Sequence, residues 1–319
     1  MIKKIKIENP DIIHLHNLHG NYLHLETLFS YLNSFKGKVF LTLHDCWAFT
    51  GKCAHYTDAN CYKWQQKCEH CPQVHTYPPS VFFDFSKKMF KDKKTNFCGI
   101  ENLKIITVSD WLKKQVENSF LNIYEIERVY NWVDNKVFKN TVGELRHELN
   151  IHDQQKIILC VSASWRKTDS TYKDLIQLSE ILGDENVIIV VGKAHVKFES
   201  PNIINIPYIA DKNKMAELYS SADVYLHLST EDTFGLVIAE ALSCGTPAIV
   251  YNSTACAEVL GSDNCGRVVE VRNIDQIVNA IDSVFLNGKE VYRPNCEKRV
   301  KTLFDKDENI SKIIELYKS

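Results

Sequence analysis

A predicted helix, residues 234–244, is apolar almost all the way round. One carboxylate, Asp232, lies just before its start, and another, Glu240, lies within it. A helix without a polar face has to be buried on every side. A lone carboxylate on such a helix is costly unless a partner pairs with it or donates hydrogen bonds to it. We therefore expect Glu240 to face a cleft and to accept hydrogen bonds from a ligand. The alternative is that Glu240 reaches water at the edge of the helix.

Other residues have the chemistry of an anion site. The N-terminus of the predicted helix offers the backbone N–H groups of Phe234, Gly235 and Leu236, and helix N-termini bind anions. Arg166 and Lys167 follow a predicted strand, residues 156–164, and supply fixed positive charge. Lys173 is open as a third choice under a different alignment of this loop. Since surface Lys and Arg are common, the alternative is that these are solvated loop cations.

Cysteines are concentrated in one polar segment: five of the eleven lie within residues 46–71. Four of these, Cys53, Cys61, Cys68 and Cys71, have intervening lengths of seven, six and two residues, and the last pair has the spacing of tetrahedral Zn²⁺ sites. His55, His70 or His75 could each replace one thiolate. The alternative is a set of small, buried apolar thiols. We expect a structural Zn²⁺ site held by the four cysteines.

The elements that position these groups alternate between strand and helix. Val/Ile/Leu-rich strands are predicted at residues 11–16, 39–44 and 103–109, with helices at 20–32 and 110–120 between and after them. From residue 156 the pattern repeats through residue 260. Strands without polar alternation indicate parallel sheets covered on both faces, so the fold class is α/β with two Rossmann-like domains. His44 ends the second strand, at the carboxyl edge where such sheets bind ligands.

Composition excludes several classes of protein. The chain has 319 residues, 45% hydrophobic and 24% charged, which is typical of a globular protein. A net charge of −2 gives no reason to expect nucleic acid as a partner. No apolar stretch approaches the length of a membrane span, and no apolar leader precedes the first strand. We expect a cytoplasmic protein with free cysteines, and peripheral contact with the inner face of the membrane stays open.

The segment around Asp232 resembles the retaining glycosyltransferases of family 4, which have the two-domain GT-B fold. The resemblance rests on the Asp232-to-Glu240 spacing, on Phe234-Gly235-Leu236 between them, and on residues 240–247, EALSCGTP. One difference is that the first carboxylate is usually Glu. In the N-terminal part, His44-Asp45 and Ser109-Asp110-Trp111 also match. The Cys-rich insert after His44-Asp45 is typical of capsule and exopolysaccharide members.

The resemblance implies roles for individual residues. It places Asp232 and His44 beside the donor sugar, and Glu240 on the nucleotide ribose. Arg166 and Lys167 would lie on the diphosphate. Glu258 matches a residue of the loop that holds the donor.

The resemblance also implies an activity and a domain division. The activity is retaining transfer of a hexosyl unit from a UDP- or GDP-sugar to a glycan or lipid-linked acceptor, in surface polysaccharide biosynthesis, with no cofactor for catalysis. The expected domains are residues 1–134, a partial N-terminal acceptor domain with the insert 46–75, and 135–291, which binds the nucleotide-sugar. Residues 292–319 are expected to form a helical tail.

One expected feature of the N-terminal domain is missing from the sequence. GT-B proteins open with a strand, a Gly-rich turn and a helix, and no such turn precedes Gly20. The sequence therefore resembles a chain that begins inside the domain, with Ile12, Ile13 and Leu15 short of packing partners. This leaves two alternatives open: a catalytically inactive remnant that binds nucleotide weakly or a protein partner, and a GT-B sugar-nucleotide epimerase.

Overall fold

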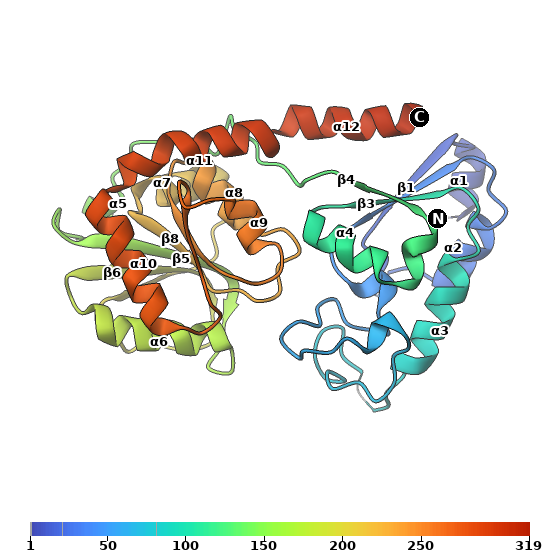
Figure 1. Ribbon diagram of the computed structural model, residues 1–319, viewed down its shortest axis with the longest axis horizontal. Helices are drawn as coiled ribbons and strands as arrows, with labels where there is room; N and C mark the ends of the chain where they lie inside the picture. Colours follow the sequence, from blue (N-terminus) through green and yellow to red (C-terminus); the bar gives the residue numbers. More distant parts are fainter. Residues whose placement is uncertain (1, 21, 81) are drawn as a thin grey trace. The chain divides into compact units, whose positions relative to one another are not determined.

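The computed structural model describes residues 2–20, 22–80 and 82–319 and divides the chain into two compact units (Figure 1). Unit 1 comprises Met1–Tyr130 and Ile310–Ser319, and unit 2 comprises Asn131–Asn309. The boundary lies four residues before the expected one. The expected tail, residues 292–319, is not one unit: its first part packs in unit 2, and its last ten residues belong to unit 1.

Unit 1 is built on a four-stranded parallel sheet of order β1-β2-β3-β4. Its elements are α1 (Ile2–Glu8), β1 (Ile12–His16), α2 (Leu25–Leu32), β2 (Lys38–Leu43), α3 (Ser86–Phe97), β3 (Leu103–Thr107), α4 (Asp110–Glu117) and β4 (Glu125–Arg128), with single 3-10 turns at Trp47–Phe49, Lys63–Gln65 and Phe120–Ile123. The predicted strands and the parallel pairing are confirmed. Helices α1 and α3 were not anticipated, and α2 begins later than expected.

Local side-chain hydrogen bonds explain two of these helix starts. Helix α2 begins at Leu25 because the His24 side chain accepts a hydrogen bond from the Thr27 N–H group and thereby caps the first turn. Helix α4 begins after Ser109, whose Oγ accepts from the Leu112 N–H group at 3.0 Å, so this predicted cap is confirmed.

Unit 2 is built on a six-stranded parallel sheet of order β10-β9-β8-β5-β6-β7. Its elements are α5 (Leu145–Glu148), β5 (Lys156–Trp165), α6 (Ser170–Leu182), β6 (Asn186–Ala194), β7 (Ile203–Ile206), α7 (Lys212–Ser221), β8 (Val224–His227), α8 (Leu236–Ser243), β9 (Ala248–Tyr251), α9 (Cys256–Leu260), β10 (Gly266–Val269), α10 (Ile274–Asn287) and α11 (Lys289–Leu303). Helices α7 and α11 pack against α8, and α10 packs against α6 (Figure 1). Strand order changes direction between β5 and β8, where doubly wound sheets open a crevice at their carboxyl ends.

Helix α8 is shorter than the predicted helix 234–244 because Gly235 does not have helical backbone angles. Its φ of +85° lies in the left-handed region, and the Gly235 carbonyl accepts the first hydrogen bond of the helix, from the Ile238 N–H group. A Cβ at this position would lie 2.8 Å from Ile238 Cδ1. The chain therefore turns sharply at Gly235 before the helix starts.

Helix α12 (Lys306–Lys318) ends on the sheet of unit 1. Its residues Ile313, Leu316 and Tyr317, together with Ile12, pack against a buried cluster of Phe40, Ile106 and Val129. Ile13 is also buried. The expectation that Ile12 and Ile13 would have too little to pack against is wrong: Ile12 packs in the cluster that α12 covers, and Ile13 is buried. Among the described residues, no helix has the length and apolarity needed to cross a membrane.

Candidate functional site

A cavity of about 290 Å³ opens in unit 2 at the carboxyl ends of β5 and β8, where the strand order changes direction. Three segments form its wall: the end of β5, the beginning of α6, and the loop from β8 to α8. The lining residues are Cys160–Ala163, Trp165, Thr171, Leu175, Leu226–Ser229, Asp232 and Val237. A cavity of this size at such an edge is a typical ligand site of an α/β protein.

An ion pair between His227 and Asp232 is the main charged feature of the cavity. His227 Nε2 donates to Asp232 Oδ2 at 2.7 Å, and His227 Nδ1 lies 3.0 Å from the Tyr225 hydroxyl oxygen. Burial alone lowers the pKa of His227, but the charge and hydrogen bond of Asp232 outweigh it and raise the pKa to about 10. His227 is therefore an imidazolium at neutral pH, and it holds Asp232 in one position at the mouth of the cavity.

Hydrogen bonds join the loop that carries Asp232 to the loop before α9. The Ala255 N–H group donates to the Asp232 carbonyl at 3.3 Å, and Ser253 Oγ donates to the Thr230 carbonyl at 3.3 Å. Cys256 lies close enough that its sulfur, a nitrogen of His227 and an oxygen of Asp232 fall within 4.8 Å of one another. Among the described residues, this is the one group of three or more such donors with that geometry.

Glu240 is half-buried on α8, and its Oε2 accepts a hydrogen bond from the Tyr219 hydroxyl at 3.0 Å. Burial raises the pKa of Glu240 to about 7, while the Tyr219 hydrogen bond and the Lys212 charge oppose this rise. The expectation that Glu240 needs a hydrogen-bond donor is met by Tyr219, which is fully buried. Its contact with a ligand stays a prediction.

The remaining predicted residues of unit 2 lie on the loops near this edge, and Asp232 is the predicted residue that lines the cavity. Arg166 and Lys167 are exposed on the β5–α6 loop, and the Arg166 N–H group donates to Asp169 Oδ2 at 3.0 Å. The Phe234 ring packs on Phe304, with centroids 5.2 Å apart. Leu236 begins α8 and is exposed, and Gly235 caps that helix.

Glu258 lies on α9, next to the loop that holds Asp232. Its backbone carbonyl accepts a hydrogen bond from Arg299 Nη2 at 2.6 Å. This contact fixes the backbone of α9 against α11, and the carboxylate of Glu258 does not line the cavity.

In unit 1, His44 lies at the carboxyl edge of the sheet, as predicted. Its Nε2 is 2.9 Å from His16 Nδ1, and the two rings stack with centroids 5.3 Å apart. Burial lowers the pKa of His44, the neighbouring His16 adds to this effect, and Asp45 opposes it. His44 is therefore a neutral hydrogen-bonding group at neutral pH. The four predicted metal ligands, Cys53, Cys61, Cys68 and Cys71, line a common small cavity in the segment that follows.

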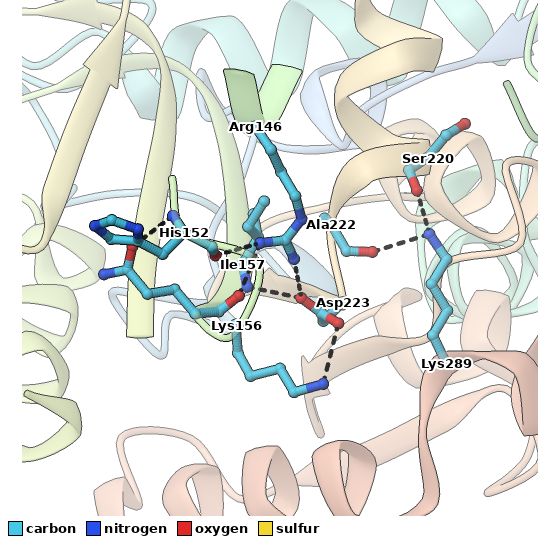
Figure 2. Close-up of polar contacts among 9 residues, drawn as sticks. Arg146, His152, Lys156, Ile157, Ser220, Ala222, Asp223 and Lys289 are labelled. Atoms are coloured by element: carbon cyan, nitrogen blue, oxygen red, sulfur yellow. Dashed lines mark hydrogen bonds and ion pairs between the residues drawn. The ribbon is translucent and has the colours of Figure 1, made fainter. Parts of the chain in front are cut away.

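A larger hollow of about 1050 Å³ lies at the opposite edge of the unit 2 sheet, along residues 140–153. Arg146 and Ser220, which line this hollow, belong to a set of structural contacts. Arg146 pairs with Asp223 at 3.2 Å, Asp223 accepts from the Ile157 N–H group at 2.8 Å, and Lys289 donates to the carbonyls of Ser220 and Ala222 (Figure 2). These contacts join the amino ends of β5 and β8, which is a structural role.

Comparisons with known proteins identify the family to which the chain belongs. A family model described as glycosyl transferases group 1 matches residues 142–301, half of the chain, and includes all of the cavity at the carboxyl edge. The chain belongs to this family.

Two relatives and one solved structure are similar to this chain. The chain is 28% identical over 277 residues to "Putative colanic acid biosynthesis glycosyl transferase WcaC" of Escherichia coli (strain K12), covering 84% of this chain and 66% of the relative. It is 25% identical over 232 residues to N-acetyl-alpha-D-glucosaminyl L-malate synthase of Bacillus anthracis, covering 69% and 60%. The chain thus spans slightly less than two thirds of either relative.

The crystal structure of Anabaena Alr3699/HepE in complex with UDP aligns with a TM-score of 0.70 at 15% identity, covering 99% of this chain and 80% of the other. This similarity shows the α/β GT-B fold with two parallel Rossmann-like sheets, as predicted.

Two side chains that pair with predicted site residues were missed by reasoning from the sequence. His227 is the one ionisable side chain of β8 that pairs with a predicted site residue, and Tyr219 is the partner of Glu240. The available signal for His227 was a histidine at the end of an otherwise apolar strand, five residues before Asp232. Tyr219 gave no comparable signal, since a tyrosine in an amphipathic helix is ordinary core.

Proposed function

We propose that this protein transfers a hexosyl unit from a nucleotide-sugar, a UDP- or GDP-sugar, to a glycan or lipid-linked acceptor in surface polysaccharide biosynthesis, with retention at the anomeric carbon. The observation that carries the proposal is the cavity at the β5–β8 crevice with the Asp232–His227 pair at its mouth, inside the segment matched by the family model. The names of the relatives support the class of product, since WcaC is named for colanic acid. The solved structure of HepE contains UDP, which supports the class of donor.

The reaction breaks the bond between the anomeric carbon and a diphosphate oxygen and forms a bond to the acceptor oxygen, whose proton is released. In this proposal Asp232 accepts hydrogen bonds from the donor sugar, and His227 keeps its carboxylate ionised and oriented. Glu240 accepts from the ribose. Arg166 and Lys167, with the N–H groups of residues 234–236, stabilise the leaving diphosphate, because fixed donors are effective in a desolvated site.

Two further roles complete the proposal. Glu258, on the helix fastened to the Asp232 loop, helps to hold the donor. His44, on the separate unit 1, contacts the sugar as a neutral hydrogen-bonding group, since burial keeps its pKa low. No cofactor is assigned to the transfer step itself.

The test is an assay of donor turnover by the purified chain. UDP- and GDP-sugars are incubated with and without a lipid-linked or oligosaccharide acceptor, and release of UDP or GDP and formation of product are followed by chromatography. Asp232→Asn is expected to reduce turnover by roughly 10²-fold or more. Asp282→Asn is the matched control, because Asp282 is exposed on α10.

Each alternative gives a different result in the same assay. Donor binding without release of nucleotide in any condition would contradict the proposal and favour a protein that binds nucleotide without turnover. Conversion of the donor into an isomeric sugar or free epimer would favour the epimerase. Equal turnover by Asp232→Asn and Asp282→Asn would show that the cavity is not the active site.

A further inference from the structure

The segment between β2 and α3 has a buried interior with very little secondary structure. Its described residues form two single 3-10 turns, yet Phe49, Tyr56 and Trp64 are almost completely buried. Trp64 packs on Phe49 and Tyr56 with ring centroids 5.0 and 5.1 Å apart. An irregular segment of this length inside a compact domain needs a constraint beyond a few ring contacts.

Four thiols lie around a cavity of about 20 Å³ in this segment: Cys53, Cys61, Cys68 and Cys71. Cys53 Sγ and Cys71 Sγ are 3.9 Å apart. Zinc–sulfur bonds of 2.3 Å in a tetrahedron place neighbouring sulfurs about 3.8 Å apart. The sulfurs of Cys53 and Cys71 are therefore already separated as two ligands of a tetrahedral site would be.

A backbone donor is aimed at a third sulfur. The Gly51 N–H group donates to Cys68 Sγ at 3.1 Å. A Cβ on Gly51 would lie 2.7 Å from Cys68 Cβ, so only glycine lets the backbone approach this closely. Amide donors to ligand sulfurs are the usual outer contacts that orient and stabilise metal thiolates.

Two buried lysines lie beside the same thiols. Lys52 and Lys93 are 2% and 3% exposed. Lys52 also lines the cavity, and Lys93 lies on α3, the helix that follows the segment. Among the described residues, neither has a carboxylate within ion-pair distance. Instead, Lys52 donates to the carbonyls of Gln73 and Thr76, at 2.7 and 2.9 Å. Lys93 donates to the Trp47 carbonyl, and its ammonium nitrogen lies over the Trp47 ring, 4.0 Å from the centroid.

Buried ammonium groups are costly without a counter-charge. Four neutral thiols provide none, but four thiolates around a divalent cation carry a net charge of −2, which two lysines balance. We propose that Cys53, Cys61, Cys68 and Cys71 bind one Zn²⁺ ion tetrahedrally, with Lys52 and Lys93 as the neutralising cations. On binding, the four thiols release their protons to solvent and form four Zn–S bonds.

The geometry needs one adjustment. No three of the four sulfurs lie within 4.8 Å of one another, so Cys61 and Cys68 have to rotate toward the Cys53–Cys71 pair when the ion binds. Both side chains line the cavity, and neither is part of a helix or strand. Rotation about the Cα–Cβ bond from one rotamer to the next moves a sulfur by about 3 Å without moving the backbone.

The bound ion would also stabilise the edge of the sheet that carries His44. Asp45 accepts from the Trp47 N–H group at 2.8 Å at the start of the segment, and it pairs with His19 at 2.6 Å. His19 Nδ1 in turn is 3.2 Å from the hydroxyl of Tyr77, near the end of the segment. Loss of the ion would therefore loosen the residues around His44.

The test is elemental analysis of the full chain, made without a metal-binding tag and purified without chelator. We expect about one equivalent of zinc per chain. Cys71→Ser and Cys61→Ser should each lose most of it. Cys98→Ser is the matched control in unit 1, since Cys98 ends α3 and its sulfur donates to the Phe120 carbonyl instead.

Two measurements keep the proposal testable if a variant fails to fold. Cobalt(II) exchanged into the unsubstituted protein should show thiolate-to-metal charge-transfer absorption and tetrahedral ligand-field bands. Less than a tenth of an equivalent of metal in folded protein would overturn the proposal, as would a Cys53–Cys71 disulfide found by mass spectrometry. Metal lost in Cys256→Ser but kept in Cys71→Ser would place the ion at the His227 cluster and also overturn it.

Discussion

The ion pair between His227 and Asp232 makes the candidate site dependent on pH at the scale of single residues. Because the folded pKa of His227, about 10, lies above its ordinary 6.5, the pair stabilises the fold fully below pH 6.5. This stabilisation is lost as the pH rises from 6.5 through 10. His227→Gln should therefore lower the free energy of unfolding by about 1–3 kcal/mol at pH 6 and by much less at pH 10.

Urea unfolding of the wild type and of His227→Gln at several pH values measures this difference. His147→Gln is the matched control, because His147 is exposed on α5. Other groups titrate in the same range in both proteins, so the difference between the two curves isolates His227. A difference that does not change with pH would contradict the pairing.

Glu240 is expected to lower the stability of the ligand-free protein and to strengthen its binding of the nucleotide-sugar. Its folded pKa of about 7 lies above 4.5, so the carboxyl stabilises the fold only while protonated, and this contribution is lost as the pH rises from 4.5 through 7. At pH 8, Glu240→Gln should raise the stability of the ligand-free protein by up to about 3 kcal/mol. It should also weaken nucleotide-sugar binding by about 1.5–3 kcal/mol, through loss of a charge-assisted hydrogen bond.

Calorimetry measures the change in affinity, and a thermal melt measures the change in stability. Together they test both parts of the prediction. Glu180→Gln, on the exposed face of α6, should change neither. A sharp fall in melting temperature with unchanged affinity would mean that Glu240 serves the fold through Tyr219 rather than the ligand.

The pattern of residues singled out Glu240, because a carboxylate in an apolar helix is improbable without a purpose, and the family resemblance singled out Asp232. Neither predicted their partners. His227 and Tyr219 meet these carboxylates across the turn from β8 to α8 and across the α7–α8 contact, and such pairings depend on packing that no local pattern encodes. The charge state of each carboxyl follows from those partners and from burial.

At the scale of elements, Gly235 determines where α8 begins and where its N–H groups point. Gly235→Ala would require a left-handed φ of +85° for a residue with a Cβ, and would bring that Cβ 2.8 Å from Ile238 Cδ1. We expect a loss of about 1–2 kcal/mol in stability. We also expect weaker donor binding, because the first turn of α8 would move.

Gly183→Ala separates these two effects. Gly183 has a φ of +62° at the end of α6, and a Cβ there would meet nothing within 4 Å. Its substitution should cost a similar amount of stability and leave donor affinity unchanged. Affinity that is equally reduced in both variants, or in neither, would contradict the role given to Gly235.

The parallel strands were predictable because buried parallel strands contain continuous runs of apolar residues, and β5 and β6 have such runs of Val, Ile and Leu. Boundaries were less predictable. Helix α3, with the sequence SKKMFKDKKTNF, was missed because its buried positions Phe90 and Phe97 are separated by a run of lysines, one of which, Lys93, is itself buried. Helix prediction depends on apolar residues at the buried positions, and a buried lysine breaks that pattern.

At the scale of the whole molecule, the order of the chain does not follow the division into units. The C-terminal stretch was predicted to form a helical tail, and α11 and α12 confirm that it is helical. The apolar residues of this tail indicate that part of it must be covered. They do not indicate which sheet receives them, because any apolar surface of matching shape would satisfy them. The cover of Phe40, Ile106 and Val129 by α12 could therefore only be learned from the structure.

Substitution of Tyr317 tests how much the packing of α12 stabilises the sheet of unit 1. Its ring packs edge-on against Phe40 with centroids 5.1 Å apart, and its hydroxyl is 2.5 Å from His14 Nδ1. Tyr317→Ala should remove this packing and leave His14 Nδ1 without its hydrogen bond, at a cost of about 2–4 kcal/mol to unit 1. Hydrogen exchange should show faster exchange in β1–β3 and unchanged protection in β5–β9. Tyr208→Ala, at a site 71% exposed in unit 2, is the control and should change neither sheet. Equal loss of protection in both sheets would mean that the two units unfold as one, and unchanged protection in β1–β3 would mean that α12 contributes little to the stability of unit 1.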